Sequence, residues 1–358
     1  MDKEVTIYDI AERLGISPTT VSRALNNHKA VNEQTKQRIF KEAKDMGYRS
    51  NIFASNLRSK RTNTIGVIVP RLNSPFQSSA IAGMEKIANE SGFNLVISQS
   101  LESLEKEIAN AQMMFNSRVD GLLVSLVDDP DNIRHCQPFI DKGIPLLFYD
   151  RVAHQAGCTG VIIDNVQAAY EATSHLIEQG CQNIVHVLGN PKINVYANRL
   201  KGYRYALLDH GLPYHAENVI HSDLSEESGE LIVQKLINMK TRPDGLFVSN
   251  DSCAASCINS LKQEGIKVPS DIAIVGFNND MISRLMEPQL STINYPAFEM
   301  GEVAMKSIVH HLNGLLGETL LNTNTITLRS ELIIRASSLK KVSSPAPSKH
   351  EALQSKPK

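Results

Sequence analysis

The sequence predicts an α/β protein in which a small helical N-terminal domain precedes a two-lobed domain built on doubly wound parallel sheets. Short apolar runs alternate with helix-like segments from Thr64 onward, and this alternation occurs twice, on either side of residues 161–165. The first 60 residues lack such runs and have three short helical patterns instead. With 358 residues the chain exceeds what one hydrophobic core usually organises, so more than one domain is expected.

The first two N-terminal helices have clear start and stop signals. Thr6 with Asp9 three residues later forms a capping-box-like start, and Gly15 ends that helix. Ser17 can cap the second helix, where Pro18 takes the first position, at which a missing N–H costs nothing. Two short helices joined through a glycine turn are typical of a helix-turn-helix.

The second helix has an inward apolar side and an outward polar side, and a third helix follows Asn32. The polar side carries hydroxyls, an amide and a guanidinium, from Thr19, Thr20, Ser22, Arg23 and Asn26. Such groups suit reading of base edges in the major groove. The alternative interpretation is a three-helix bundle that docks on protein, because Ser, Thr and Asn are also ordinary capping residues.

The apolar runs of the larger domain read as parallel strands. They are TIGVIV, FNLVIS, GLLVS and IPLLFY in the first half, then NIVHVLG, GLFVSN and IAIVGF in the second. Segments with helical period separate them, over 77–91, 103–116 and 168–179 among others. Continuous apolar character indicates burial on both faces of the sheet. Because ligands of such sheets bind beyond the carboxyl ends of the strands, a cleft between the lobes is the expected site.

Charge is distributed unevenly along the chain. Residues 1–61 carry 12 Lys and Arg against 7 Asp and Glu, a net charge of +5, while the rest of the chain has a net charge of −6. A basic end on an acidic body favours a polyanionic partner such as nucleic acid, although a solvated charged face remains an alternative.

Several classes of protein and site are disfavoured. No stretch approaches the roughly 20 apolar residues that cross a bilayer, and the N-terminus has no apolar signal segment, so a cytoplasmic protein without a membrane partner is expected. The cysteines are odd in number and form no C-x-x-C pair, which disfavours disulfides and a metal site. No metal and no cofactor is predicted. Residues 339–358, rich in Ser, Pro and Lys, are expected to be disordered.

Three stretches make the sequence similar to a known family. VTIYDIAERLGISPTTVSRALNN, VNEQTKQRIFKEAKDMGY and TNTIGVIVP resemble the lactose repressor family of bacterial regulators, whose close relatives include the purine repressor. The resemblance covers residues 5 to about 338. It implies a three-helix helix-turn-helix domain at 1–49, a hinge helix at 50–61, and a periplasmic-binding-protein-like sensor at 62–338. The sensor's N-lobe would span about 62–163 and 293–321, and its C-lobe about 164–292 and 322–338.

The resemblance also implies which residues contact DNA. In the helix-turn-helix they are Thr6, Ser17, Pro18, Thr19, Thr20, Ser22, Arg23, Asn26 and His28. Arg23 is the expected base reader, because its guanidinium can bind guanine through two hydrogen bonds. In the hinge, Ala54 and Leu57 would enter the minor groove, with Leu57 as a wedge and Arg58 near phosphates.

The hinge departs from the family pattern in two places. Ser50 stands where proline is common, and Ser55 with Asn56 replaces the usual Arg-Ser, which removes a possible phosphate contact.

The effector-contacting positions implied by the resemblance fall at or just after strand ends. They are Phe76, Gln77, Asp150, Arg199, Asn250, Asp251 and Asn278. Converging carboxylate, amide and guanidinium groups with an aromatic ring suit a small polar ligand. A sugar or sugar derivative is favoured over a purine, which usually needs two stacking faces. Two alternatives remain: Asp150 could form only an ion pair with Arg151, and Asp251 could only cap the helix that it precedes.

The predicted function is a sequence-specific DNA-binding transcriptional regulator, a repressor associated with the nucleoid. It would bind a palindromic operator as a homodimer under control of the small effector. The alternative is a small-molecule-binding protein or an α/β enzyme with an unrelated N-terminal helical domain. An enzyme is not expected, because the sequence contains no G-x-S-x-G, Walker, G-x-G-x-x-G or H-E-x-x-H motif in a suitable context.

Overall fold

The computed structural model describes residues 5–48, 61–127, 133–153, 159–314 and 325–340. Contacts divide the chain into two compact units, Met1–Thr62 and Asn63–Lys358. The expected hinge contacts of Ala54, Leu57 and Arg58 lie outside the described residues.

The N-terminal unit contains the three expected helices, α1 (Ile7–Leu14), α2 (Pro18–Leu25) and α3 (Glu33–Asp45). The capping box is confirmed, since one carboxylate oxygen of Asp9 accepts from the Thr6 N–H at 2.7 Å and from its hydroxyl at 2.6 Å. Gly15 follows α1 with φ of 65°, a conformation that glycine adopts without strain. The helices enclose a small buried core made of Ile10, Ala11, Val21, Ala24, Ile39 and Ala43.

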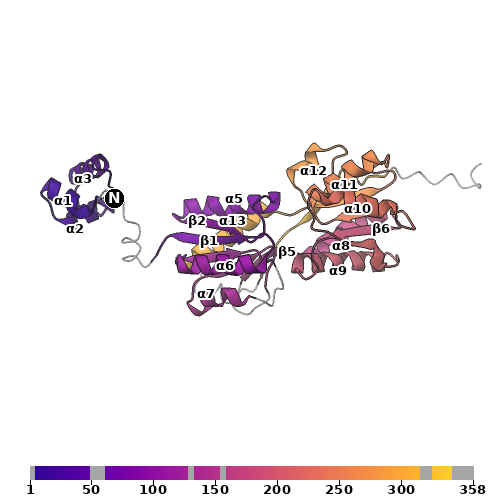
Figure 1. The fold of residues 1–358 in the computed structure, drawn as a ribbon, viewed down its shortest axis with the longest axis horizontal. Helices are drawn as coiled ribbons and strands as arrows, with labels where there is room; N and C mark the ends of the chain where they lie inside the picture. The colour runs from indigo at the N-terminus through magenta and orange to yellow at the C-terminus, as the bar shows by residue number, and fades with distance from the viewer. Residues whose placement is uncertain (1–4, 49–60, 128–132, 154–158, 315–324, 341–358) are drawn as a thin grey trace, which may run out of the picture. The chain divides into compact units, whose positions relative to one another are not determined.

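The first lobe of the larger unit is a six-stranded sheet in the order β11-β5-β4-β3-β1-β2. All its neighbouring strands are parallel. The strands are β1 (Thr64–Val69), β2 (Asn94–Gln99), β3 (Gly121–Val124), β4 (Leu146–Tyr149), β5 (Thr159–Ile163) and β11 (Thr325–Leu328). Helices α5 (Pro75–Glu90) and α13 (Ala297–Leu312) cover one face, and α6 (Leu104–Asn116) and α7 (Gln137–Asp141) cover the other, as Figure 1 shows. The short η1 (Arg134–Cys136) contacts α6 and α7.

The second lobe has the matching sheet, in the order β12-β10-β9-β8-β6-β7. Its strands are β6 (Ile184–Leu188), β7 (Val219–His221), β8 (Gly245–Val248), β9 (Ala273–Asn278), β10 (Ser291–Asn294) and the antiparallel edge strand β12 (Glu331–Ile333). Helices α8 (Asn165–Glu178) and α9 (Asn194–Asp209) lie on one face, and α10 (Ser228–Ile237) and α11 (Asp251–Gln263) on the other. The short elements η2 (Ala216–Asn218) and α12 (Met281–Leu285) complete it. The doubled, doubly wound α/β fold is therefore confirmed.

Two of the expected lobe boundaries are wrong. Residues 322–338 were expected in the C-lobe, but β11 within that range pairs in parallel with β5 of the N-lobe, with Ile326 opposite Val161. Strand β10 pairs with β9 through Asn294, so the C-lobe extends past the expected boundary at 293. The chain thus crosses between the lobes after β5, after β10 and between β11 and β12. These short strands have too few apolar residues to be recognised before pairing is known.

Strand β2 differs from the expectation of burial on both faces. Val96 and Ile97 are 36% and 38% exposed. The physical reason is position, because β2 is the edge strand and pairs only with β1.

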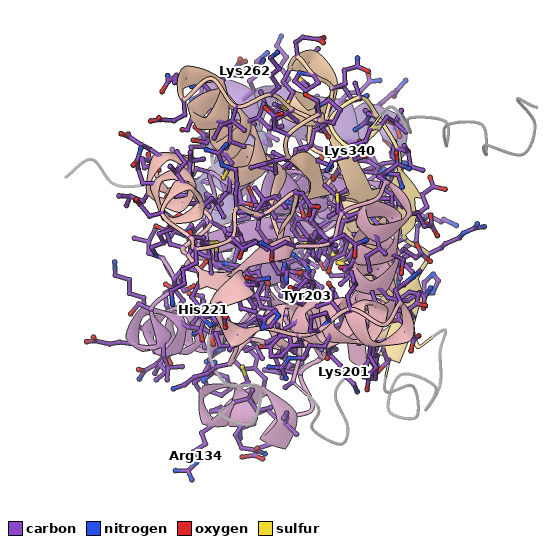
Figure 2. The ribbon with its side chains drawn as sticks, turned by 90° about the vertical axis from the view of Figure 1, so that its right-hand side faces the viewer. Arg134, Lys201, Tyr203, His221, Lys262 and Lys340 are labelled. Carbon is purple, nitrogen blue, oxygen red and sulfur yellow. The ribbon has the colours of Figure 1, made fainter. Side chains whose placement is uncertain are left out.

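Leu339 and Lys340, which were expected to be disordered, belong to the described fold. Ser338 is fully buried, and Lys340 donates from Nζ to the Asp244 carbonyl at 2.9 Å. In Figure 2 Lys340 lies against the C-lobe. The same figure labels two residues of α9, the buried Tyr203 and the exposed Lys201. Residues 341–358 lie outside the described part of the chain.

Candidate functional site

Helix α2 presents its polar side to solvent while Val21 and Ala24 are buried. Thr19 and Arg23 are exposed, and Pro18, Thr20 and Ser22 are half-buried. The Ser17 side chain caps the helix by accepting from the Thr20 N–H at 3.1 Å, and its hydroxyl lies 2.8 Å from that of Thr20. The expected DNA-facing residues of the helix therefore share one accessible side, and within the described residues the Arg23 side chain makes no hydrogen bond or ion pair.

The turn after α2 is held by side chains. Asn26 donates from its amide nitrogen to the Ser22 carbonyl at 2.7 Å. Asn27, with φ of 51°, accepts at 2.6 Å from the buried ammonium group of Lys36 on α3. His28 accepts through Nδ1 from the Ala30 N–H at 3.1 Å. These bonds fix the backbone that carries Asn26 and His28, two of the residues expected to contact DNA.

A cavity of about 350 Å³ lies between the two lobes at the carboxyl ends of their strands. That volume is at the lower end of the range for small-molecule sites. Six of the seven expected effector residues line it: Phe76, Gln77, Asp150, Arg199, Asn250 and Asn278.

Asp150 organises the N-lobe wall of the cavity. Its carboxylate accepts from the Tyr295 hydroxyl at 2.8 Å, and from the Gln77 amide and the Ser125 hydroxyl at 3.3 Å each. Burial raises its pKa, while Arg151 and the Tyr295 hydrogen bond oppose that rise. Gln77 also accepts from the Tyr149 hydroxyl at 2.8 Å. The two predicted ligand contacts are therefore joined directly to each other.

The idea that Asp150 only pairs with Arg151 is wrong. Arg151 instead binds Glu102 through both terminal nitrogens, at 2.7 and 3.2 Å. Arg71 approaches the same Glu102 carboxylate at 3.6 Å. Glu102 thus neutralises much of the positive charge on this wall.

Arg199 crosses the cavity wall from α9 and is 3% exposed. It donates from Nε to the Asn165 side chain and from Nη1 to the Ser249 carbonyl, both at 2.9 Å. Its guanidinium carbon lies 3.5 Å from the centre of the Phe277 ring. Phe76 packs against Tyr295 with ring centroids 4.4 Å apart, so the cavity has one aromatic pair beside a stacked guanidinium.

Asp251 does not line the cavity, so its predicted effector contact is wrong. The side chain is fully buried and accepts from the Thr292 hydroxyl at 2.7 Å and from the Asp280 N–H at 2.8 Å. The alternative role as helix cap is also wrong, because Asn250 caps α11 by accepting from the Cys253 N–H at 3.0 Å. Burial raises the pKa of Asp251 to about 7 and that of neighbouring Asp280 to about 6.

Sequence reasoning missed several lining residues. They are mainly Arg71, Glu102, Tyr196, Asp223, Glu226, Glu227, Ser249 and Tyr295. Ser249 could have been found, since it precedes Asn250 at the same strand end. Tyr295 follows β10 and the acidic residues follow β7, and neither strand is recognisable as an apolar run. Arg71 and Glu102 lie in loops with no distinguishing pattern.

No helix within the described residues is long and apolar enough to cross a membrane. In the same part of the chain, no group of three or more His, Cys, Asp and Glu could hold a metal ion.

A helix-turn-helix with an accessible guanidinium, together with a two-lobed domain around a polar cavity, defines a DNA-binding transcriptional regulator with a ligand-binding sensor. The chain belongs to the lacI family of bacterial regulatory proteins. Residues 6–51 match the model of that family, and residues 173–338 match that of the periplasmic binding protein-like domain.

Similar proteins span nearly the whole chain. It is 31% identical to catabolite control protein A of Priestia megaterium, over 86% of this chain and 93% of that one. A lac repressor dimer bound to operator and the anti-inducer ONPF aligns with a TM-score of 0.83 at 25% identity, over 94% of this chain and 100% of that one. The regulator CelR in complex with cellobiose aligns with a TM-score of 0.70 at 26% identity, over 93% and 100%.

Proposed function

We propose that this protein is a repressor that binds a palindromic operator as a homodimer and releases or engages it in response to a sugar or sugar derivative. The observation that carries the proposal is the cavity between the lobes, whose lining converges arginine, carboxylate, amide and aromatic groups. Ligand contacts with both lobes would bias their relative orientation, which is a common basis of allosteric control.

A sugar-like effector is favoured by the chemistry of the lining. Hydrogen-bonding groups dominate it, beside three aromatic residues, of which Phe76 and Tyr295 pack against each other and Tyr196 lies on α9. The cellobiose complex of the similar regulator CelR agrees with this preference.

A homodimer fits both the DNA and the surface of the C-lobe. A palindromic site presents two equivalent half-sites to two recognition helices. Helix α12 exposes three apolar side chains, with Met281 66%, Ile282 40% and Leu285 74% accessible. The solved lac repressor that this chain resembles is a dimer on its operator.

Three further parts of the proposal follow from DNA binding. The domain scheme assigns 1–49 to DNA reading and 50–61 to a hinge that couples effector state to DNA. The protein would act in the cytoplasm, on the nucleoid. It would carry out no catalysis, in keeping with similar proteins that are transcriptional regulators.

The DNA-binding proposal is tested with Arg23→Ala. Operator sites are first selected from the genome of the organism that encodes the protein. Affinity for the selected site and for scrambled DNA is then measured at several salt concentrations. We expect the variant to lose the preference for its site, by about one to two orders of magnitude, while salt-sensitive binding to any DNA persists.

The matched control is Lys44→Ala, which removes an exposed cation from α3 of the same unit. It should keep the site preference. Selection of no palindromic site would overturn the proposed function, whereas an unchanged preference in Arg23→Ala would overturn only the role of Arg23.

A further inference from the structure

The loop after β7 brings three carboxylates to the mouth of the cavity. Asp223, Glu226 and Glu227 all line it, and all three are exposed. Hydrogen bonds from Ser228 and Ser225 lower the pKa of Asp223, with a smaller contribution from Arg71 of the other lobe. Within the described residues, no hydrogen bond or ion pair engages the side chains of Glu226 and Glu227. The loop therefore presents negative charge that the protein itself does not neutralise.

The charge balance of the whole lining has the same sign. Three arginines, Arg71, Arg151 and Arg199, face five carboxyl groups: Glu102, Asp150, Asp223, Glu226 and Glu227. Carboxylates remain in excess even when Asp150, whose pKa burial raises, is counted as neutral.

Two of these arginines are also already hydrogen-bonded. Arg151 binds Glu102 through two nitrogens, and two nitrogens of Arg199 bind Asn165 and the Ser249 carbonyl. An anionic ligand would therefore meet an excess of negative charge, together with two arginines whose nitrogens already donate hydrogen bonds within the protein.

A second observation points to a ligand with hydroxyl groups at the same edge. Ser249 lines the cavity and is 3% exposed, yet its hydroxyl has no hydrogen-bond partner in the described part of the chain. A buried polar group without a partner costs free energy, which a bound ligand can recover. Ser249 follows β8 and Asp223 lies just beyond β7, and both strands flank β6. The unpartnered hydroxyl and the acidic loop thus lie along one edge of the C-lobe sheet.

We propose that the effector is a cationic sugar derivative, an amino sugar whose ammonium group binds the loop of Asp223, Glu226 and Glu227 while a ring hydroxyl pairs with Ser249. The inference rests on the proposed function and narrows its ligand class. Neutral sugars would lack the ion pairs with the loop, and sugar acids or phosphates would be repelled by it.

The test is isothermal titration of the full-length protein with matched sugars. Glucosamine, galactosamine and mannosamine are each compared with the parent hexose, the N-acetyl derivative and the uronic acid, in one buffer at low salt. We expect at least one amine to bind about tenfold or more tighter than its three counterparts, as two partly screened ion pairs would give.

Variants assign the preference to the loop. The double substitution Glu226→Gln with Glu227→Gln should remove the tenfold advantage of the amine and leave the thermal midpoint of the ligand-free protein unchanged, since both side chains are exposed. The matched control Glu230→Gln alters an exposed carboxylate of α10 that does not line the cavity, and it should bind the amine like the parent protein.

The other outcomes separate the two proposals. A hexose or uronic acid that binds as tightly as its amine, or a double variant that keeps the advantage, would overturn the cationic class and leave a sugar effector in place. Binding of none of these compounds would overturn the amino-sugar effector, while the Arg23→Ala experiment decides DNA binding independently.

Discussion

The Arg199 guanidinium contacts three groups at the cavity wall: the Asn165 side chain, the Ser249 carbonyl and the Phe277 ring. Its Nε and Nη1 satisfy the Asn165 side chain and the Ser249 carbonyl, and its plane stacks on Phe277. Burial of a cation is costly unless it is hydrogen-bonded, and burial indeed lowers the pKa of Arg199 from its ordinary value. The residue is therefore structural as well as a candidate ligand contact.

Arg199→Ala should lower the free energy of unfolding by about 3 kcal/mol, because it leaves the Asn165 side chain and the Ser249 carbonyl without their donor and creates a void. Urea denaturation measures this. Lys201→Ala, which changes an exposed residue two positions along the same helix, should shift stability by less than about 0.5 kcal/mol. Equal effects of the two substitutions would contradict the structural role of Arg199.

Asp251 gives the C-lobe a pH dependence of known sign. Its pKa rises from 3.8 to about 7 on folding, mainly through burial. The stability linked to its protonated form is therefore complete below about pH 4 and is lost as the pH rises towards 7. Asp251→Asn has no titrating group at this position, so the stability difference between parent and variant should shrink over that interval.

The expected slope of that difference is at most about 1.4 kcal/mol per pH unit, since one proton is involved. Chemical denaturation between pH 4.5 and 8 measures it. Asp209→Asn, at an exposed aspartate on α9, serves as the control and should show no slope of this kind. A constant difference for Asp251→Asn would show that the carboxyl titrates normally.

At the scale of elements, α5 and α13 pack so closely that glycine is required between them. A Cβ added at Gly301 would lie 1.9 Å from the Ala80 carbonyl oxygen, and one at Gly83 would lie 2.0 Å from that of Phe298. Both obstacles are backbone atoms of a neighbouring helix, which no side-chain rotation can relieve.

Gly301→Ala should consequently destabilise the protein by about 1–3 kcal/mol, even though alanine favours helix. Thermal or urea unfolding checks this against Glu299→Ala, on the exposed side of α13, which should be nearly neutral. Stabilisation by Gly301→Ala would mean that the two helices are farther apart than described.

Elements with strong local signals were predictable. The capping box at Thr6, the glycine after α1 and the long apolar strands all occur where the sequence placed them. Strands β7, β10, β11 and β12 were not, because each contains only one or two Val, Ile or Leu residues and most of their stabilisation comes from pairing with a neighbour. The two misplaced lobe boundaries follow directly from those missed strands.

At the scale of the whole molecule, α12 supplies an apolar surface that a homodimer would cover. Leu285→Lys should shift the protein towards monomer and weaken binding to a palindromic site by more than tenfold, because each half-site would bind a separate chain. Size-exclusion chromatography with light scattering reports the first effect, and a mobility shift on the selected operator reports the second.

Leu208→Lys is the matched control, since Leu208 is also 74% exposed but lies on α9, across the sheet from α11. It should leave both assembly and DNA binding intact. A dimer that survives Leu285→Lys would place the interface elsewhere.

The sequence by itself determined the order of domains, the helix-turn-helix and most strand ends, because caps, glycines and apolar runs act over a few neighbouring residues. Only the tertiary structure decided which polar groups meet. It turned Asp251 away from the cavity and into a hydrogen-bonded cluster, and it bound Arg151 to Glu102 rather than leaving it to Asp150. It also brought Glu226 and Glu227 to the cavity mouth. Such contacts join residues far apart in the chain, so chain crossings and sheet order set them, and no local pattern encodes them.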